Sequence, residues 1–118
     1  MLTLPSAVKI FLHTRPTDMR CGFHKLSMLA ESIMQQDPFS GHLFVFFNRS
    51  GDKVKILFWD RSGFVVWYKR LEEGTFEKLP SPAGQMTLEI DIAKLTWILE
   101  GIDLFKSRCR KRYQRQSS

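Results

Sequence analysis

The sequence predicts a single α+β domain in which an antiparallel β-sheet is packed by one amphipathic helix. Its 118 residues are 43% apolar, which is enough for one hydrophobic core at this chain length. Two turn sequences, Asn48-Arg49-Ser50-Gly51 and Asp60-Arg61-Ser62-Gly63, separate three runs rich in Val, Ile and aromatic residues. Apolar residues also recur at helical spacing between Phe23 and Met34. Together these patterns favour a sheet and a covering helix.

The N-terminal part of the chain predicts a strand followed by that helix. Residues 7–13 form a short β-branched and aromatic run that ends at a proline-containing turn. The helical pattern covers residues 23–36 and stops at an Asp-Pro pair, because the residue before a proline disfavours the helical conformation. If Thr17 or Asp18 caps the helix, it begins before Gly22; otherwise it begins just after Gly22.

Three strands are expected next, over residues 42–47, 53–59 and 64–71. The turns between them lie 12 residues apart, and each has an Asx residue first and a glycine fourth, which is typical of a type I turn closed by glycine. Because short turns join antiparallel neighbours, the pattern predicts a three-stranded meander. Alternation gives the middle strand one face for packing against a helix and a second, mixed face. The first face holds Val54, Ile56 and Phe58, and the second holds Lys53, Lys55, Leu57 and Trp59.

The C-terminal part predicts two further short elements and a tail. A strand is expected near residues 86–90, and Asp91 is expected to cap a short helix over residues 92–99 that a glycine ends. Residues 106–118 are basic and lack apolar periodicity, so they are expected to be disordered or to fold only on a partner. The predicted domain therefore spans residues 1–105, followed by a basic tail.

The formal net charge of +6 belongs to this tail. The tail holds six basic residues and no acid, whereas the other 105 residues hold twelve basic and twelve acidic groups. Within that neutral body, residues 49–70 are net positive and residues 71–105 are net negative. The sequence thus describes a neutral but polarised domain with a cationic extension.

The sequence contains no strong catalytic or metal-binding motif. It has no Walker loop, GxGxxG or GxSxG motif, and its acids lack the spacing of a metal-ion pair or an acid/base dyad. Cys21 and His24 form a lone CxxH pair, whereas a zinc site needs three or four converging ligands. We therefore expect no enzymatic activity, metal or cofactor. No apolar run reaches the ~18 residues of a membrane span and no signal peptide is evident, so a cytoplasmic protein without membrane contact is expected.

Two basic segments are candidates for nucleic-acid binding. Lysine and arginine bind phosphates with release of counterions, and aromatic rings can stack on exposed bases. The tail offers Lys106, Arg108, Arg110, Lys111, Arg112, Tyr113 and Arg115. The meander offers Lys53, Lys55, Trp59, Lys69 and Arg70. The alternatives are a solubilising tail and an ordinary solvated sheet face.

Several long ungapped segments carry a family resemblance over residues 6–105. They include Arg15-Pro16-Thr17-Asp18-Met19-Arg20, Asp37-Pro38-Phe39-Ser40-Gly41-His42, Asn48-Arg49 with Gly51-Asp52, Trp67-Tyr68-Lys69-Arg70-Leu71-Glu72 and Leu99-Glu100-Gly101-Ile102-Asp103. In these segments the chain resembles the TnpB-type accessory protein of the bacterial insertion-sequence family sixty-six. It does not resemble the RNA-guided nucleases of similar name.

The resemblance implies a non-catalytic accessory factor for transposition, a form of DNA recombination, in the bacterial cytoplasm. Its expected partners are the DNA at the element's ends and the transposase encoded beside it. A protein–protein adaptor that does not bind DNA is the alternative. Within the first motif, Arg15, Asp18 and Arg20 are expected to form either a structural ion-pair cluster at the helix start, which we favour, or a partner site. No oligomeric state follows from the sequence.

Overall fold

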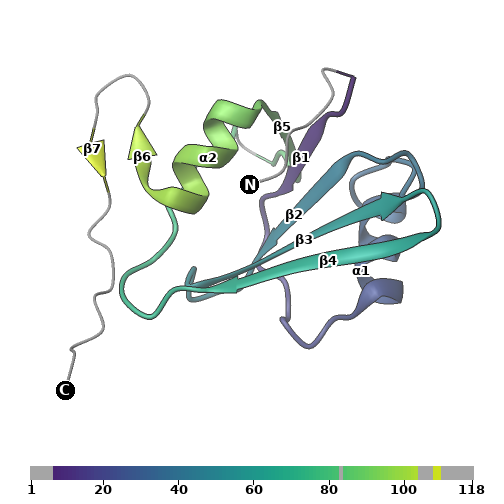
Figure 1. Cartoon of the computed structure of the whole chain (residues 1–118), viewed down its shortest axis with the longest axis horizontal. Coiled ribbons are helices and arrows are strands. Elements are labelled where there is room, and N and C mark those ends of the chain that lie inside the picture. Colours follow the sequence, from purple (N-terminus) through teal and green to yellow (C-terminus); the bar gives the residue numbers. More distant parts are fainter. Residues whose placement is uncertain (1–6, 83, 104–107, 110–118) are drawn as a thin grey trace.

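A five-stranded sheet with a helix on each face forms the body of the protein in the computed structural model, which describes residues 7–82, 84–103 and 108–109 (Figure 1). The elements in chain order are β1 (Ile10–His13), α1 (Phe23–Ser32), β2 (Leu43–Phe47), β3 (Lys53–Asp60), β4 (Gly63–Arg70), β5 (Thr87–Ile90), α2 (Ile92–Glu100), β6 (Ile102–Asp103) and β7 (Arg108–Cys109). The α+β class predicted from the sequence is confirmed.

The sheet is mixed rather than wholly antiparallel, with the strand order β4-β3-β2-β1-β5. β1 runs parallel to β2, with Ile10 opposite Leu43, and antiparallel to β5. β2, β3 and β4 pair antiparallel in chain order. The prediction of an antiparallel sheet was wrong for the β1–β2 pair. Parallel neighbours need a long crossover connection, and α1 is part of that connection between β1 and β2.

Each face of the sheet carries its own hydrophobic cluster. The α1 side buries Leu26, Ala30, Met34, Phe44, Phe46 and Leu57 together with Phe11. The α2 side buries residues that include Val45, Val54, Ile56, Leu95, Ile98 and Leu99. The mixed face of β3 therefore lies partly under α1, and the short C-terminal helix covers the apolar face. Because both faces are covered, the run Leu43–Phe46 in β2 is buried at every position.

The two helices begin in different ways. Asp91 caps α2 as predicted, its side chain accepting a 2.8 Å hydrogen bond from the backbone N–H of Lys94, and Gly101 ends the helix at φ +67°. α1 begins just after Gly22, which acts as N-cap without a side-chain hydrogen bond. Neither Thr17 nor Asp18 caps it, and of the two starting points predicted from the sequence the later one is observed.

The two turns that repeat in the sequence differ in geometry. Gly51 has φ +75°, and its carbonyl accepts a 2.8 Å hydrogen bond from the backbone N–H of Phe76. Gly63 instead pairs with Asp60 as the first residue of β4. In this second turn the left-handed residue is Arg61, at φ +50°. The two turns, predicted from the sequence to be of one kind, therefore differ in which residue takes the left-handed conformation.

Candidate nucleic-acid interface

The parallel pairing of β1 and β2 brings two distant segments of the chain side by side. The loop over residues 14–22 follows β1, and the turn over residues 48–52 follows β2. Both leave the carboxyl ends of their strands, which meet at the same edge of the sheet and are where ligands bind in many α/β sheets. The backbone N–H of Thr17 donates a 2.7 Å hydrogen bond to the carbonyl of Phe47, which fixes the loop beside the end of β2.

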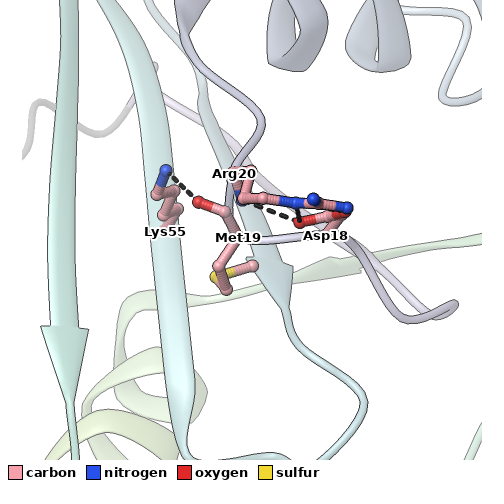
Figure 2. Close-up of polar contacts among 4 residues, drawn as sticks. All are labelled: Asp18, Met19, Arg20 and Lys55. Carbon is pink, nitrogen blue, oxygen red and sulfur yellow. Dashed lines mark hydrogen bonds and ion pairs between the residues drawn. The ribbon is translucent and has the colours of Figure 1, made fainter.

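Lys55 ties the same loop to the middle of the sheet (Figure 2). Its Nζ donates hydrogen bonds of 2.6 Å to the carbonyl oxygen of Met19 and 2.9 Å to that of Cys21. The ammonium group also lies 5.1 Å from the ring centroid of Tyr68, its cross-strand neighbour on β4. An ammonium has three donors, and two of these are occupied inside the protein. Lys55, a sequence candidate for nucleic-acid contact, therefore acts as a tether in this structure.

Asp18 and Arg20 form a local pair within the tethered loop (Figure 2). Nη2 of Arg20 lies 2.7 Å from Oδ2 of Asp18, and the other carboxylate oxygen accepts a 2.9 Å hydrogen bond from the backbone N–H of Arg20. The hydrogen bonds from Arg20 lower the pKa of Asp18 to about 2. Arg15 does not join this pair and lines a neighbouring hollow instead. The predicted three-residue cluster is thus a two-residue ion pair with a separate arginine.

Two adjacent hollows open where the loop and the turn meet. A small one of about 170 Å³ is lined by Arg15, Arg49, Lys78 and Glu77, among others. A wider one of about 530 Å³ is lined by Pro16, Thr17, Asp18, Met19, Arg20, Asn48, Arg49, Ser50 and Lys53. The two share Pro16, Asn48 and Arg49. Each hollow therefore combines three cationic side chains with one carboxylate, which makes both electropositive.

The turn after β2 is held in shape by its own polar side chains. Asn48 Oδ1 accepts a 3.1 Å hydrogen bond from the backbone N–H of Lys53, and Asn48 Nδ2 donates a 2.7 Å bond to Asp52. This donation is the main reason that the pKa of Asp52 is lowered. Lys53 lies directly opposite Arg70 in the β3–β4 ladder, and Arg70 pairs with Glu72 at 3.0 Å. Like charges directly opposite each other are unfavourable, but here Glu72 pairs with Arg70, and Asp52 interacts electrostatically with both cations.

The remaining sheet candidates have internal partners. Lys69 lies on the α2 side of β4, where its Nζ donates a 3.3 Å hydrogen bond to the carbonyl of Leu99 near the end of α2. Trp59 packs edge-on against Phe39 and Phe64, with ring centroids 5.0 and 5.1 Å away. Lys53 and Arg70 thus share one end of the sheet with the hollows, whereas Lys69 lies on the opposite face and Trp59 lies at the other end of β3.

The comparison with protein families identifies the chain's relatives. A family model described as "IS66 Orf2 like protein" matches residues 8–109. The chain belongs to this family. It is 39% identical over 102 residues to y4hO of Sinorhizobium fredii, an alignment that covers 85% of this chain and 87% of that protein. It is 31% identical over 96 residues to y4jC of the same organism, with 81% and 80% covered. Both relatives are described as uncharacterized, and no solved structure matches the chain.

The basic tail of the chain falls largely outside the described residues. Arg108 belongs to β7, whose backbone pairs antiparallel with β6. The candidates that lie outside the described residues are Lys106, Arg110, Lys111, Arg112, Tyr113 and Arg115. Within the described part of the chain, no helix is long and apolar enough to cross a membrane. In that same part, no three His, Cys, Asp or Glu side chains gather as a metal site would require.

Sequence reasoning missed Thr17 and Arg49 as candidate site residues. Both lie in segments that carry the IS66 Orf2-like resemblance, yet their proximity depends on the parallel pairing of β1 with β2. A signal for this was present, because a strand, a helix and a second strand in succession are the parts of a βαβ unit. That pattern would have placed residues 14–22 and 48–52 at one edge of the sheet.

Proposed function

We propose that this IS66 Orf2-like protein is a non-catalytic accessory factor for transposition that binds the DNA of the insertion sequence and contacts its transposase. Family membership supports the connection with the insertion sequence. The observation that supports direct DNA binding is the pair of electropositive hollows, because five cationic side chains from three segments converge there. These are Arg15, Arg20, Arg49, Lys53 and Lys78.

The basic tail extends this proposal. Its six positive charges lie C-terminal to α2, Arg108 within β7 and the other five outside the described residues, and lysine and arginine in such a segment can contact the phosphates of a DNA backbone. In this view the tail supplies affinity that depends strongly on salt. The hollows of the body position the duplex relative to the sheet.

A full-length protein titrated with labelled DNA tests the proposal. Fluorescence anisotropy would compare a duplex of the element's terminal repeats with a shuffled duplex of equal length, from 50 to 200 mM salt. If the six tail cations meet phosphates, affinity falls about a thousandfold over this range. A full-length variant with those six residues changed to Gln should show a shallower salt dependence. Failure of the wild-type protein to bind either duplex at 50 mM salt would refute DNA binding.

A protein–protein adaptor is the second candidate, and the edge strand β4 favours it. β4 is eight residues long and terminates the sheet order, so one side of its backbone has no strand neighbour in the described sheet. Val65 and Trp67 on this strand are exposed apolar side chains. Co-purification with the transposase in the presence of nuclease, together with no binding to DNA, would favour this function.

A further inference from the structure

We propose that the wider hollow is a phosphate-binding site for the DNA backbone, in which Arg49 and Lys53 supply positive charge and the hydroxyl of Thr17 supplies a hydrogen bond. This inference rests on the proposed function, because it assigns one specific contact within DNA binding. In this proposal the turn after β2, rather than the flat face of the sheet, is the part of the body that contacts the DNA duplex.

The charges around the hollow favour an anion. Arg20 is neutralised by its ion pair with Asp18, the one carboxylate in the lining. Arg49 is exposed and Lys53 is half-exposed, and among the described residues neither side chain makes a hydrogen bond or an ion pair. Lys53 also interacts electrostatically with the carboxylate of Asp52, the next residue on the turn, so Arg49 is the cation whose charge is least offset beside the satisfied pair. Charge-assisted hydrogen bonds from arginine and lysine side chains are strong contacts with phosphate oxygens.

Thr17 provides an independent indication of a ligand. The residue is only 6% exposed, and its Oγ1 is a buried side-chain oxygen that has no hydrogen-bond partner among the described residues. Buried polar groups are nearly always partnered, so an unpartnered hydroxyl in the lining of a cationic hollow calls for an explanation. A phosphate oxygen entering the hollow would supply the partner, with rotation about χ1 of Thr17 presenting the hydroxyl.

The scaffold keeps these groups in place. Thr17 is fixed to Phe47 through its backbone, and the loop around it is held by the hydrogen bonds of Lys55. Asn48 bonds the backbone N–H of Lys53 and so sets the start of β3 relative to Arg49. Loop and turn are therefore joined through β1, β2 and β3 rather than free to separate. The backbone of the site is therefore held before binding, and the freedom lost on binding is that of the Arg49 and Lys53 side chains.

The sequence repeat offers a matched control for the test. Arg49 and Arg61 occupy the same position in the two turns, and both are exposed, but only Arg49 lines the hollow. We expect Arg49→Gln and Lys53→Gln each to weaken binding to a terminal-repeat duplex several-fold at 100 mM salt. Each should also lower the slope of log affinity against log salt by about 1. Arg61→Gln should leave both quantities unchanged. Equal losses for Arg49→Gln and Arg61→Gln would refute the site while leaving DNA binding intact.

The Thr17 hydroxyl is tested by a pair of substitutions. Thr17→Val keeps the shape and removes the hydroxyl, so DNA affinity should fall while the melting temperature is maintained or raised. Thr17→Ser keeps the hydroxyl and should keep the affinity. If Thr17→Val binds as tightly as the wild type, the hydroxyl has no role and this part of the assignment is wrong.

Two further results distinguish a DNA phosphate from free phosphate as the ligand, and failure of this site from failure of DNA binding as a whole. In an NMR titration of the full chain, the duplex should shift the backbone amide signals of residues 17, 49 and 53. Shifts with inorganic phosphate but none with the duplex would mean that the hollow takes a free anion and not a DNA backbone. Absence of any duplex binding by the wild-type protein would overturn the proposed function and this inference with it.

Discussion

The Nζ of Lys55 on β3 lies 2.6 Å from the carbonyl oxygen of Met19, a residue 36 positions earlier in the chain (Figure 2). With its second bond to Cys21, this side chain attaches the β1–α1 loop to the sheet. A residue that a sequence pattern assigns to DNA contact is in this way part of the scaffold beneath the candidate site.

Lys55→Met should therefore weaken the fold more than a typical surface change. The substitution keeps most of the stem but leaves two carbonyl oxygens without their donor, and hydrogen bonds to charged groups contribute roughly 1.5–3 kcal/mol each, less where water can replace the donor. We expect the free energy of unfolding, measured by urea denaturation, to fall by about 2 kcal/mol. Lys53→Met is the control and should cost less than about 0.5 kcal/mol. Equal stability of the two variants would contradict the tether.

The two turn glycines should respond differently to alanine. Gly51 has φ +75°, where an L side chain is strained, so Gly51→Ala should lower the free energy of unfolding by about 1 kcal/mol. Gly63 lies outside the left-handed region and a Cβ there meets no atom within 4 Å, so Gly63→Ala should be close to neutral. Arg61→Gly should be neutral or stabilising, because it relieves the positive φ of Arg61. Thermal melts of the three variants test this ranking.

The ion pair between Asp18 and Arg20 predicts that the carboxyl group of Asp18 titrates at an unusually low pH. Arg20 lowers the pKa of Asp18 from 3.8 to about 2, so the native state prefers the ionised carboxylate more than the unfolded chain does. Its contribution to stability is therefore complete above about pH 4 and is lost as the pH falls through about 2. Carboxyl ¹³C NMR should report the low pKa in the wild type and a value near 3.8 in Arg20→Gln. Arg15→Gln should leave it unchanged, and a wild-type pKa near 3.8 would show that the pair does not form in solution.

The lowered pKa of His13 predicts a second pH dependence of stability, in a pH range higher than that of Asp18. Burial lowers its pKa below 6.5, and nearby Arg15 acts in the same direction, while the 3.2 Å contact of Nδ1 with the carbonyl of Met86 opposes them. The unfolded chain then binds a proton more readily than the native state. Stability should consequently fall as the pH drops below 6.5, until the native imidazole is also protonated. Urea denaturation between pH 7 and 5 should show this fall in the wild type and a smaller one in His13→Phe.

The sequence predicted those parts of the fold that local interactions determine. Alternation and turn residues located the three strands between Leu43 and Arg70 to within a residue or two. As expected, α2 begins at its N-cap Asp91 and ends at the left-handed Gly101. Each of these features depends on a few neighbouring residues, through backbone geometry or capping.

The candidate site depended on contacts that are distant in the sequence. Whether Lys55 and Lys69 are free or occupied is decided by the carbonyl oxygens that packing brings within their reach, which no local pattern contains. The location of Arg49 beside Thr17 likewise required β1 to run parallel to β2.

By itself, the sequence determined the α+β class, the strands of the sheet, the caps of α2 and the family resemblance. These features depend on residues that are close together in the sequence, so they can be recognised without knowledge of tertiary contacts. Only the tertiary structure decided which cations share a hollow and which serve as internal donors. The physical reason is that strand pairing and the burial of both sheet faces set the distances between residues far apart in the chain. The electrostatic interaction of a charged side chain with its neighbours depends on these distances.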